Sequence, residues 1–147
     1  MISDVLRMPS MHVNQVAPNV DLVAEIRELN TGGVMGPWAW SILAGPEDPF
    51  APGVVTLTVG VHGNIGALVW LDQEKAYVPT SGSNTKWCEY RLGGMHESPI
   101  PPFAEVPVET VYIALAEFLN NHCLPTCVEW RQAAPIETLF QDRAGPT

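Results

Sequence analysis

A succession of β-rich runs between residues 38 and 92 constrains the fold of this chain more than any other feature. Hydrophobic residues alternate with small or polar ones in several of these runs, which is the pattern of half-buried strands. Gly63 and Asn64 separate two of the runs and indicate a hairpin turn. Strands that follow one another through short turns are typical of an antiparallel meander. We therefore expect strands in these segments: 38–43, 54–61, 65–72, 75–80 and 86–92.

Two further segments have the spacing of amphipathic helices. The first lies within 20–30 and follows Asn19, which we predict to be its N-cap. The second ends near residue 122 and carries Pro107 in its predicted first turn. The predicted apolar faces are Leu22, Val23, Ile26 and Leu29 in the first helix, and Val108, Val111, Tyr112, Leu115, Phe118 and Leu119 in the second.

The sequence thus predicts an α+β fold, in which an antiparallel β-meander sheet packs with two main helices that form a single layer on it. The length of 147 residues, 46% of them hydrophobic, suits one domain over 1–147. Within it we expect an irregular, partly mobile arm at 1–18 and a Pro-rich connector at 95–107. A last strand is expected at 127–132, followed by a tail at 133–147 that carries one helical turn.

The charge balance is strongly acidic, with a formal net charge of −9. Between Leu92 and Trp130 the chain has no Lys or Arg, but it has Glu97, Glu105, Glu109, Glu117 and Glu129. Such a surface repels nucleic acid phosphates and suits a basic protein partner. The alternative is that the acidity only keeps the protein in solution.

The N-terminal residues and the cysteines bear on the compartment. The first ten residues lack the basic start and apolar core of a signal peptide, and no stretch is apolar enough to span a membrane. Three cysteines are an odd number, which favours free thiols in a reducing compartment. We therefore expect a cytoplasmic protein.

The cysteines raise two chemical alternatives. Cys123 and Cys127 lie beside His122, but structural zinc sites usually carry two such pairs, so we expect buried free thiols and no metal. Cys88 is a conceivable enzymatic nucleophile, although only Arg91 nearby offers an activating charge. Phosphate-loop, Gly-x-Ser-x-Gly and zinc-deaminase motifs are absent from the sequence, so we expect neither catalytic residues nor a cofactor.

Alternation in the expected strand 86–92 separates two faces. These faces are formed by Cys88, Tyr90 and Leu92, and by Trp87, Glu89 and Arg91. The first set suits a core. The second combines an aromatic residue with both signs of charge, which is the residue mix of an interface hot spot. Two interpretations stay open: Trp87 packs against the second helix of its own chain, or it faces another molecule.

Two stretches of the chain resemble the deaminase-toxin immunity proteins of bacterial polymorphic toxin systems, Imm family one. They are GSNTKWCEYRLGG (82–94) and PPFAEVPVETVYIALAEFLNNHCLPTCVEW (101–130). The shared features are a Gly-rich turn, a Tyr-containing strand, a Gly-Gly break, a VP-x-E helix start, the helix body, and a late Pro and Trp. They fall on Gly82, Tyr90, Gly93, Gly94, Pro107 to Glu109, Ala114 to Phe118, Pro125 and Trp130. The resemblance is good from Tyr77 onward and elsewhere extends only to the order of elements.

The resemblance implies a non-enzymatic inhibitor that binds a cognate toxin, often a nucleic acid deaminase, and blocks its active site in the cytoplasm of the producing cell. The expected partner is therefore a basic protein toxin, with neither nucleic acid nor membrane as a partner and no homo-oligomer implied. From the alternation argument, the predicted toxin-binding residues are Asp72, Glu74, Ser81, Ser83, Asn84, Trp87, Glu89 and Arg91. The alternatives are a small-molecule-binding or enzymatic domain that uses Cys88 or the Trp-rich sheet, and a structural subunit of an obligate complex.

Overall fold

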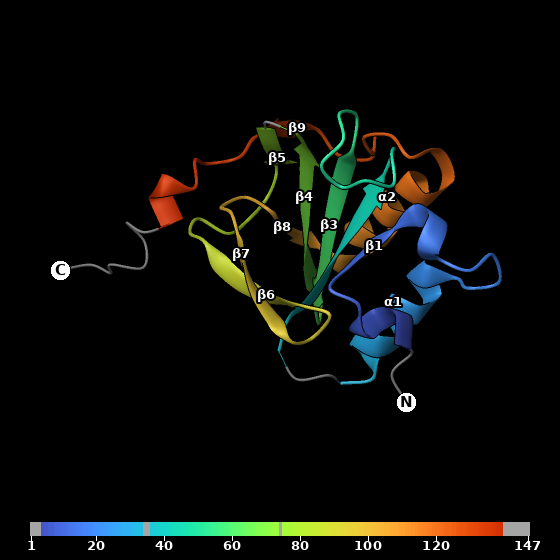
Figure 1. Ribbon diagram of the computed structural model, residues 1–147. Coiled ribbons are helices and arrows are strands. Elements are labelled where there is room, and N and C mark those ends of the chain that lie inside the picture. The colour runs from blue at the N-terminus through green and yellow to red at the C-terminus, as the bar shows by residue number, and fades with distance from the viewer. Residues whose placement is uncertain (1–3, 34–35, 74, 140–147) are drawn as a thin grey trace.

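A mixed sheet forms the centre of the computed structural model, which describes residues 4–33, 36–73 and 75–139 (Figure 1). The main path of the sheet has the strand order β7-β6-β2-β3-β4-β5-β9, while β1 pairs with β2 and β8 pairs with β4. The strands are β1 (Ser10–His12), β2 (Trp38–Ala44), β3 (Val55–His62), β4 (Ile65–Asp72), β5 (Lys75–Pro79), β6 (Cys88–Leu92), β7 (His96–Ile100), β8 (Glu105–Pro107) and β9 (Trp130–Gln132).

The predicted antiparallel meander is confirmed only from β2 to β5, including the two-residue hairpin turn after His62. Beyond β5 the prediction is wrong, because β6 and β1 both pair with β2 in the parallel sense. The outer edge of β5 is occupied by β9, with Tyr77 opposite Gln132. The chain therefore crosses from β5 to the far side of β2, where β6 and β7 form an antiparallel hairpin. The α+β class holds, with a sheet of mixed direction.

The N-terminal segment belongs to the core, which contradicts the expected irregular arm. Leu6 and Met11 are each 1% exposed, and β1 pairs along β2. The indole Nε1 of Trp40 donates a hydrogen bond to the carbonyl of Leu6 across 2.8 Å. The expected connector at 95–107 is likewise ordered, because it supplies β7 and β8. Two short 3₁₀ helices, η1 (Asp4–Arg7) and η2 (Val13–Gln15), flank β1.

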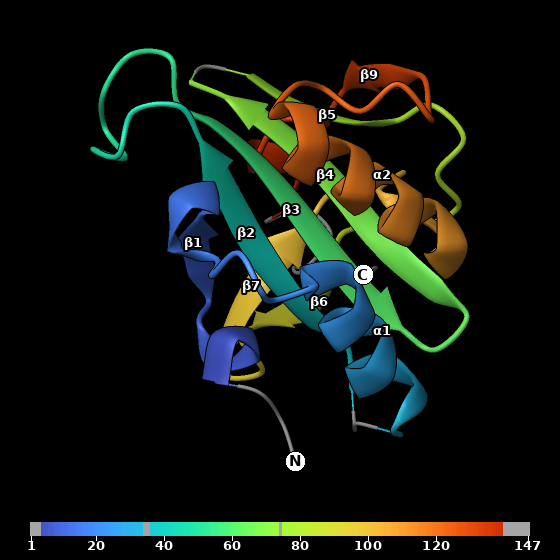
Figure 2. The same ribbon diagram turned by 90° about the vertical axis from the view of Figure 1, so that its right-hand side faces the viewer.

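Helices α1 (Leu22–Thr31) and α2 (Val108–Asn121) cover one face of the sheet, with the β6–β7 hairpin behind it (Figure 2). The N-cap of α1 is Asp21, whose carboxylate accepts the amide of Ala24, so the prediction of Asn19 was wrong. Pro107 ends β8 and is the N-cap of α2, so it lies one position before the first helical turn, in which it was predicted. The predicted apolar faces of both helices are confirmed, because all their residues lie in or against one core. The buried ones are Leu22, Ile26, Leu29, Val108, Val111, Tyr112, Leu115 and Phe118.

A second core lies on the opposite face of the sheet, where the β6–β7 hairpin and residues 101–104 cover it. Its buried members are Ala39, Ala67, Val78, Tyr90, Ile100 and Ala104. Ala39, Gly60 and Ala67 are in register across β2, β3 and β4, and their small size leaves room for a large side chain above them. Tyr90 fills that room, since a Cβ atom added at Gly60 would lie 2.6 Å from the Tyr90 ring.

The C-terminal end departs from the prediction in length. Strand β9 comprises only three residues of the expected 127–132 segment. Residues 137–139 are helical, in agreement with the expected turn, and residues 140–147 of the expected tail lie outside the described residues. Among the helices that the structure describes, none is long and apolar enough to cross a membrane.

Candidate functional site

Strand β6 has the two faces that its alternation predicts. Tyr90 is 1% exposed, while Glu89 and Arg91 are exposed on the other face. Trp87 directly precedes the strand and is half-buried. Its indole Nε1 donates a hydrogen bond to Oγ1 of Thr138 across 2.8 Å. This hydrogen bond joins Trp87 to the C-terminal turn, a contact that neither open interpretation anticipated.

The loop at 81–84 is fastened to the segment before α2 by its Asn84 side chain. Nδ2 of Asn84 donates to the carbonyl of Pro101 across 3.0 Å, and Oδ1 accepts the amide of Glu105 across 2.9 Å. The amide of Ser83 donates to the carbonyl of Glu105 across 2.8 Å. The side chains of Ser81 and Ser83 are exposed, whereas Asn84 is half-buried. Asn84 therefore holds the loop in place, and the two serines present polar groups on its surface.

The acidic part of the predicted site lies at a different end of the sheet. Asp72 ends β4 opposite Val55, which in turn is opposite Ala44 at the end of β2. Arg91 is in register with Trp38 at the start of β2. At about 3.3 Å per residue, the two ends of β2 are roughly 20 Å apart along the strand. The structure thus separates Asp72 from the β6 residues; Glu74 lies outside the described residues.

A polar cluster that the sequence did not reveal lies beneath β6. The Tyr90 hydroxyl donates a hydrogen bond to Oε2 of Glu105 across 2.7 Å, and Nδ2 of Asn84 lies 3.8 Å from Sγ of Cys88. Burial, followed by the nearby Glu105 carboxylate, raises the pKa of the Cys88 thiol to about 12. Burial and the hydrogen bond to Glu105 also raise the pKa of Tyr90. Because the thiolate is the reactive form, Cys88 at neutral pH is a poor nucleophile.

The other two cysteines differ from the prediction in burial. Cys123 and Cys127 are both exposed, so the expectation of buried thiols at the helix end was wrong. The reason is that α2 ends at Asn121 and that, apart from the buried Pro125 and the half-buried Val128, the residues before β9 are exposed. In the part of the chain that the structure describes, no group of three or more His, Cys, Asp or Glu side chains is placed to hold a metal ion.

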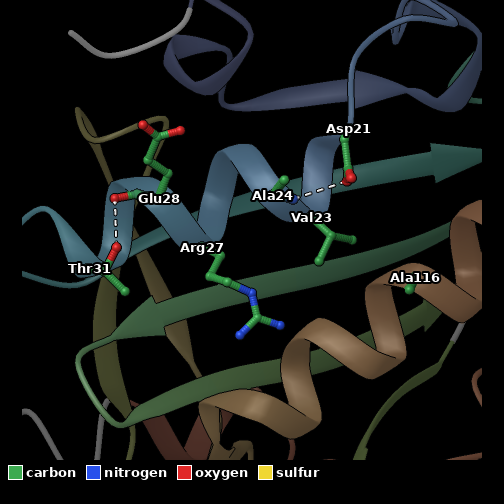
Figure 3. A pocket seen from close by; sticks show the side chains of 7 residues that line it. All are labelled: Asp21, Val23, Ala24, Arg27, Glu28, Thr31 and Ala116. Atoms are coloured by element: carbon green, nitrogen blue, oxygen red, sulfur yellow. Dashed lines mark hydrogen bonds between the residues drawn. The ribbon is translucent and has the colours of Figure 1, made fainter.

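A groove of about 580 Å³ lies between the two helices on the other side of the molecule (Figure 3). Arg27 points into it from α1, and its guanidinium lies 2.9 Å from the Glu109 carboxylate and 4.2 Å from the centre of the Tyr112 ring. These contacts join α1 to α2. The groove is lined by Asp21, Val23, Ala24, Arg27, Glu28, Thr31 and Ala116.

A known protein family matches most of the chain. Residues 16–132 match the model of the family described as immunity protein Imm1. The chain belongs to the Imm1 immunity protein family. The match runs from before α1 to the end of β9, so it includes the N-terminal half, where the resemblance had extended only to the order of elements. No curated protein matches the chain. Membership in the Imm1 family indicates a non-enzymatic role, in which the protein binds a cognate polymorphic toxin and neutralises it.

Proposed function

We propose that this Imm1 protein neutralises a nucleic acid deaminase toxin by binding over its active site, in the cytoplasm of the producing cell. The observation that carries the proposal is the family match over residues 16–132. The whole chain acts as one immunity-protein domain. The alternative enzymatic use of Cys88 gains no support from its site, because a thiol with a pKa near 12 stays protonated.

The charge of the chain supports a toxin of the deaminase type. An enzyme that acts on nucleic acid holds phosphates with basic side chains, and its active site is therefore electropositive. A partner with a net charge of −9 is attracted to such a site over long distance, and nucleic acid itself is repelled. Steric cover of the active site combined with this steering accounts for inhibition without any chemistry by the immunity protein.

The proposed toxin-binding surface comprises the exposed face of β6, the adjoining loop and the β4–β5 turn. On β6, Glu89 and Arg91 are exposed, and Arg91 lies opposite the exposed Glu97 of β7. Ser81, Ser83 and Trp87 extend this surface along the chain, and Asn84 contributes by holding the loop. Asp72 forms its far part, and the proposal also includes Glu74, which lies outside the described residues. A typical interface of about 800 Å² per partner is roughly 30 Å across, so one toxin can reach both parts.

The proposal is tested by purifying the chain together with the product of the neighbouring toxin gene. We expect a 1:1 complex that abolishes toxicity. We further expect that reversing three acids together, Asp72→Lys, Glu74→Lys and Glu89→Lys, weakens toxin affinity at least about tenfold, mainly through slower association.

A matched control variant separates the position of the charges from their number. Asp4→Lys, Glu25→Lys and Glu28→Lys raise the net charge by the same amount, from −9 to −3, at positions on η1 and α1 outside the proposed surface. This control should lose less affinity than the first variant. Equal affinities for the two variants would show that the proposed surface is in the wrong place, and absence of any complex would reject the function.

A further inference from the structure

The loop between β2 and β3 presents an aromatic side chain to solvent. Phe50 is 93% exposed, more than any other large hydrophobic side chain in the described part of the chain. Exposed apolar residues are common on protein surfaces, but a fully exposed Phe on a projecting loop removes nothing from water within its own chain. In Figure 2 this loop extends beyond the sheet, above β1 and β2. The Phe50 ring therefore adds little to the stability of the fold and is accessible to a partner.

The neck of this loop is closed and restrained. Gly45 and Gly53 have φ angles of 100° and 92°, and a Cβ atom added at Gly45 would lie 2.7 Å from the carbonyl oxygen of Gly53. Only glycine combines that conformation with so close an approach. Between the two glycines the φ angles of Pro46, Pro49 and Pro52 are fixed by their rings. The loop has little conformational entropy left to lose when a partner binds it.

Two hydrogen bonds from neighbouring elements and one within the loop hold it in position. Nε2 of His12 lies 2.7 Å from the carbonyl oxygen of Gly45, which ties the neck to the end of β1. Nε2 of Gln73 donates to the carbonyl of Ala51 across 2.9 Å, which ties the tip to the β4–β5 turn. Within the loop, Oδ1 of Asp48 accepts the amide of Phe50 across 3.0 Å. The backbone that carries the Phe50 side chain is thus fixed before any partner arrives.

The surroundings of Phe50 indicate the chemistry of its partner. Glu47 and Asp48 precede it and are exposed, and the sequence has no Lys or Arg between Arg27 and Lys75. Two grooves adjoin the loop, one of about 320 Å³ beside Glu47 and one of about 370 Å³ that contains both Asp72 and Lys75. An exposed aromatic ring with carboxylates beside it fits an apolar pocket that has basic groups at its rim. The same carboxylates disfavour an anionic membrane or a nucleic acid.

We propose that Phe50 is an anchor residue of the toxin interface, inserted into an apolar pocket of the toxin whose rim is basic. This inference rests on the proposed function and extends its surface, because the Gln73 hydrogen bond places the loop beside Asp72. A rigid aromatic side chain on a restrained loop adds buried area at little entropic cost, as hot-spot residues do.

The test uses the full chain and an inactive form of the toxin encoded by the neighbouring gene. Phe50→Ala should raise the dissociation constant about 30-fold or more, mainly through faster dissociation. The dissociation constant of Phe50→Leu should lie between those of the native chain and Phe50→Ala. The control is Ile113→Ala, which truncates a side chain 56% exposed on α2 and should change affinity less than about threefold. Thermal unfolding should be unchanged by Phe50→Ala, because the ring packs against little of its own chain.

The outcomes separate this inference from the proposed function. If the native chain binds the toxin and Phe50→Ala binds it within about threefold, the anchor is rejected and the immunity function stands. If the native chain does not bind the toxin, both are rejected. If Phe50→Ala instead changes the oligomeric state of the chain alone, measured by sedimentation, the loop is a contact between copies and the anchor is again rejected.

Discussion

Tyr90 reaches from β6 across the small residues of three strands and donates a hydrogen bond to Glu105 of β8 across 2.7 Å. β6 pairs with β2, and Glu105 lies opposite Ala67 of β4, so this one side chain connects the β6–β7 hairpin to the opposite part of the sheet. The ring of the exposed His62 also meets the Tyr90 ring edge to face, with 6.4 Å between centres. The position of the proposed toxin-binding face on β6 therefore depends on this contact.

Removing the Tyr90 hydroxyl tests how much its hydrogen bond to Glu105 stabilises the fold. Tyr90→Phe keeps the ring but leaves the half-buried Glu105 carboxylate without this donor, so we expect the free energy of unfolding to fall by about 1–3 kcal/mol. Glu105→Gln retains an oxygen acceptor and should cost less. Urea unfolding at neutral pH measures both. A Tyr90→Phe protein as stable as the native one would mean that the hydrogen bond contributes nothing.

The packing of the Tyr90 ring over Gly60 also contributes to the stability of the fold. In Gly60→Ala the new Cβ would lie 2.6 Å from the buried Tyr90 ring, so ring or strand must move. We expect a loss of about 1–3 kcal/mol, the usual cost of overpacking a core. Combining it with Tyr90→Leu should cost less than the sum of the two single changes. Strict additivity in this cycle, measured by urea unfolding, would contradict the packing described here.

The raised pKa of Cys88 predicts a loss of stability at alkaline pH. Its thiol has a pKa of about 12 in the folded protein, against an ordinary value of 9.0. The unfolded chain therefore loses this proton first as the pH rises. The contribution of the protonated Cys88 thiol to the free energy of unfolding is complete below pH 9 and is lost as the pH approaches 12. Tyr90 acts in the same direction, because its pKa is also raised.

Removing the thiol should weaken this pH dependence. Urea midpoints measured from pH 8 to pH 11 should fall less steeply for Cys88→Ala than for the native chain, with the Tyr90 contribution remaining. Cys123→Ala removes an exposed thiol and serves as the control, with a slope like that of the native chain. If Cys88→Ala and the native chain had the same slope, burial of the thiol would have no thermodynamic effect.

Arg27 connects the two helices and offers a further test. Its guanidinium pairs with Glu109 and lies over the Tyr112 ring, but both charged groups are largely exposed. We expect Arg27→Ala to cost about 1 kcal/mol, with part of the loss removed by high salt. Arg27→Lys should recover less than half of it, because an ammonium lacks the planar stacking surface. Full recovery by Lys would show that only charge matters.

Local patterns in the sequence predict the strands and helices that bury one regular face, but not the pairing of strands far apart in the chain. The alternation around Trp40 and Leu57 predicts β2 and β3 because one face of each strand packs under the helices. The parallel pairing of β6 with β2 has no local signal, because it joins segments about 50 residues apart in the chain, and the same is true of the pairing of β9 with β5. Leu6 and Met11 are core residues without any period around them, and so they were missed.

In the candidate site, too, the sequence predicted which way side chains face but not the contacts between distant segments. The two faces of β6 follow from alternation and were predicted, with Tyr90 inward and Glu89 outward. The contact of Trp87 with Thr138 joins residues far apart in the chain, and no spacing rule reveals it. The distance between Asp72 and Arg91 depends on strand register, which sequence alone did not provide. The half-buried Glu105 came from a segment that had been expected to be a connector.

We propose that this chain inhibits a nucleic acid deaminase by binding over its active site. The most direct measurement is deamination of a nucleic acid substrate by the toxin of the neighbouring gene, titrated with this protein. We predict that activity falls linearly and is abolished at one equivalent, and that excess substrate slows the onset of inhibition. Full activity at equimolar or higher concentrations of the native chain would contradict the account.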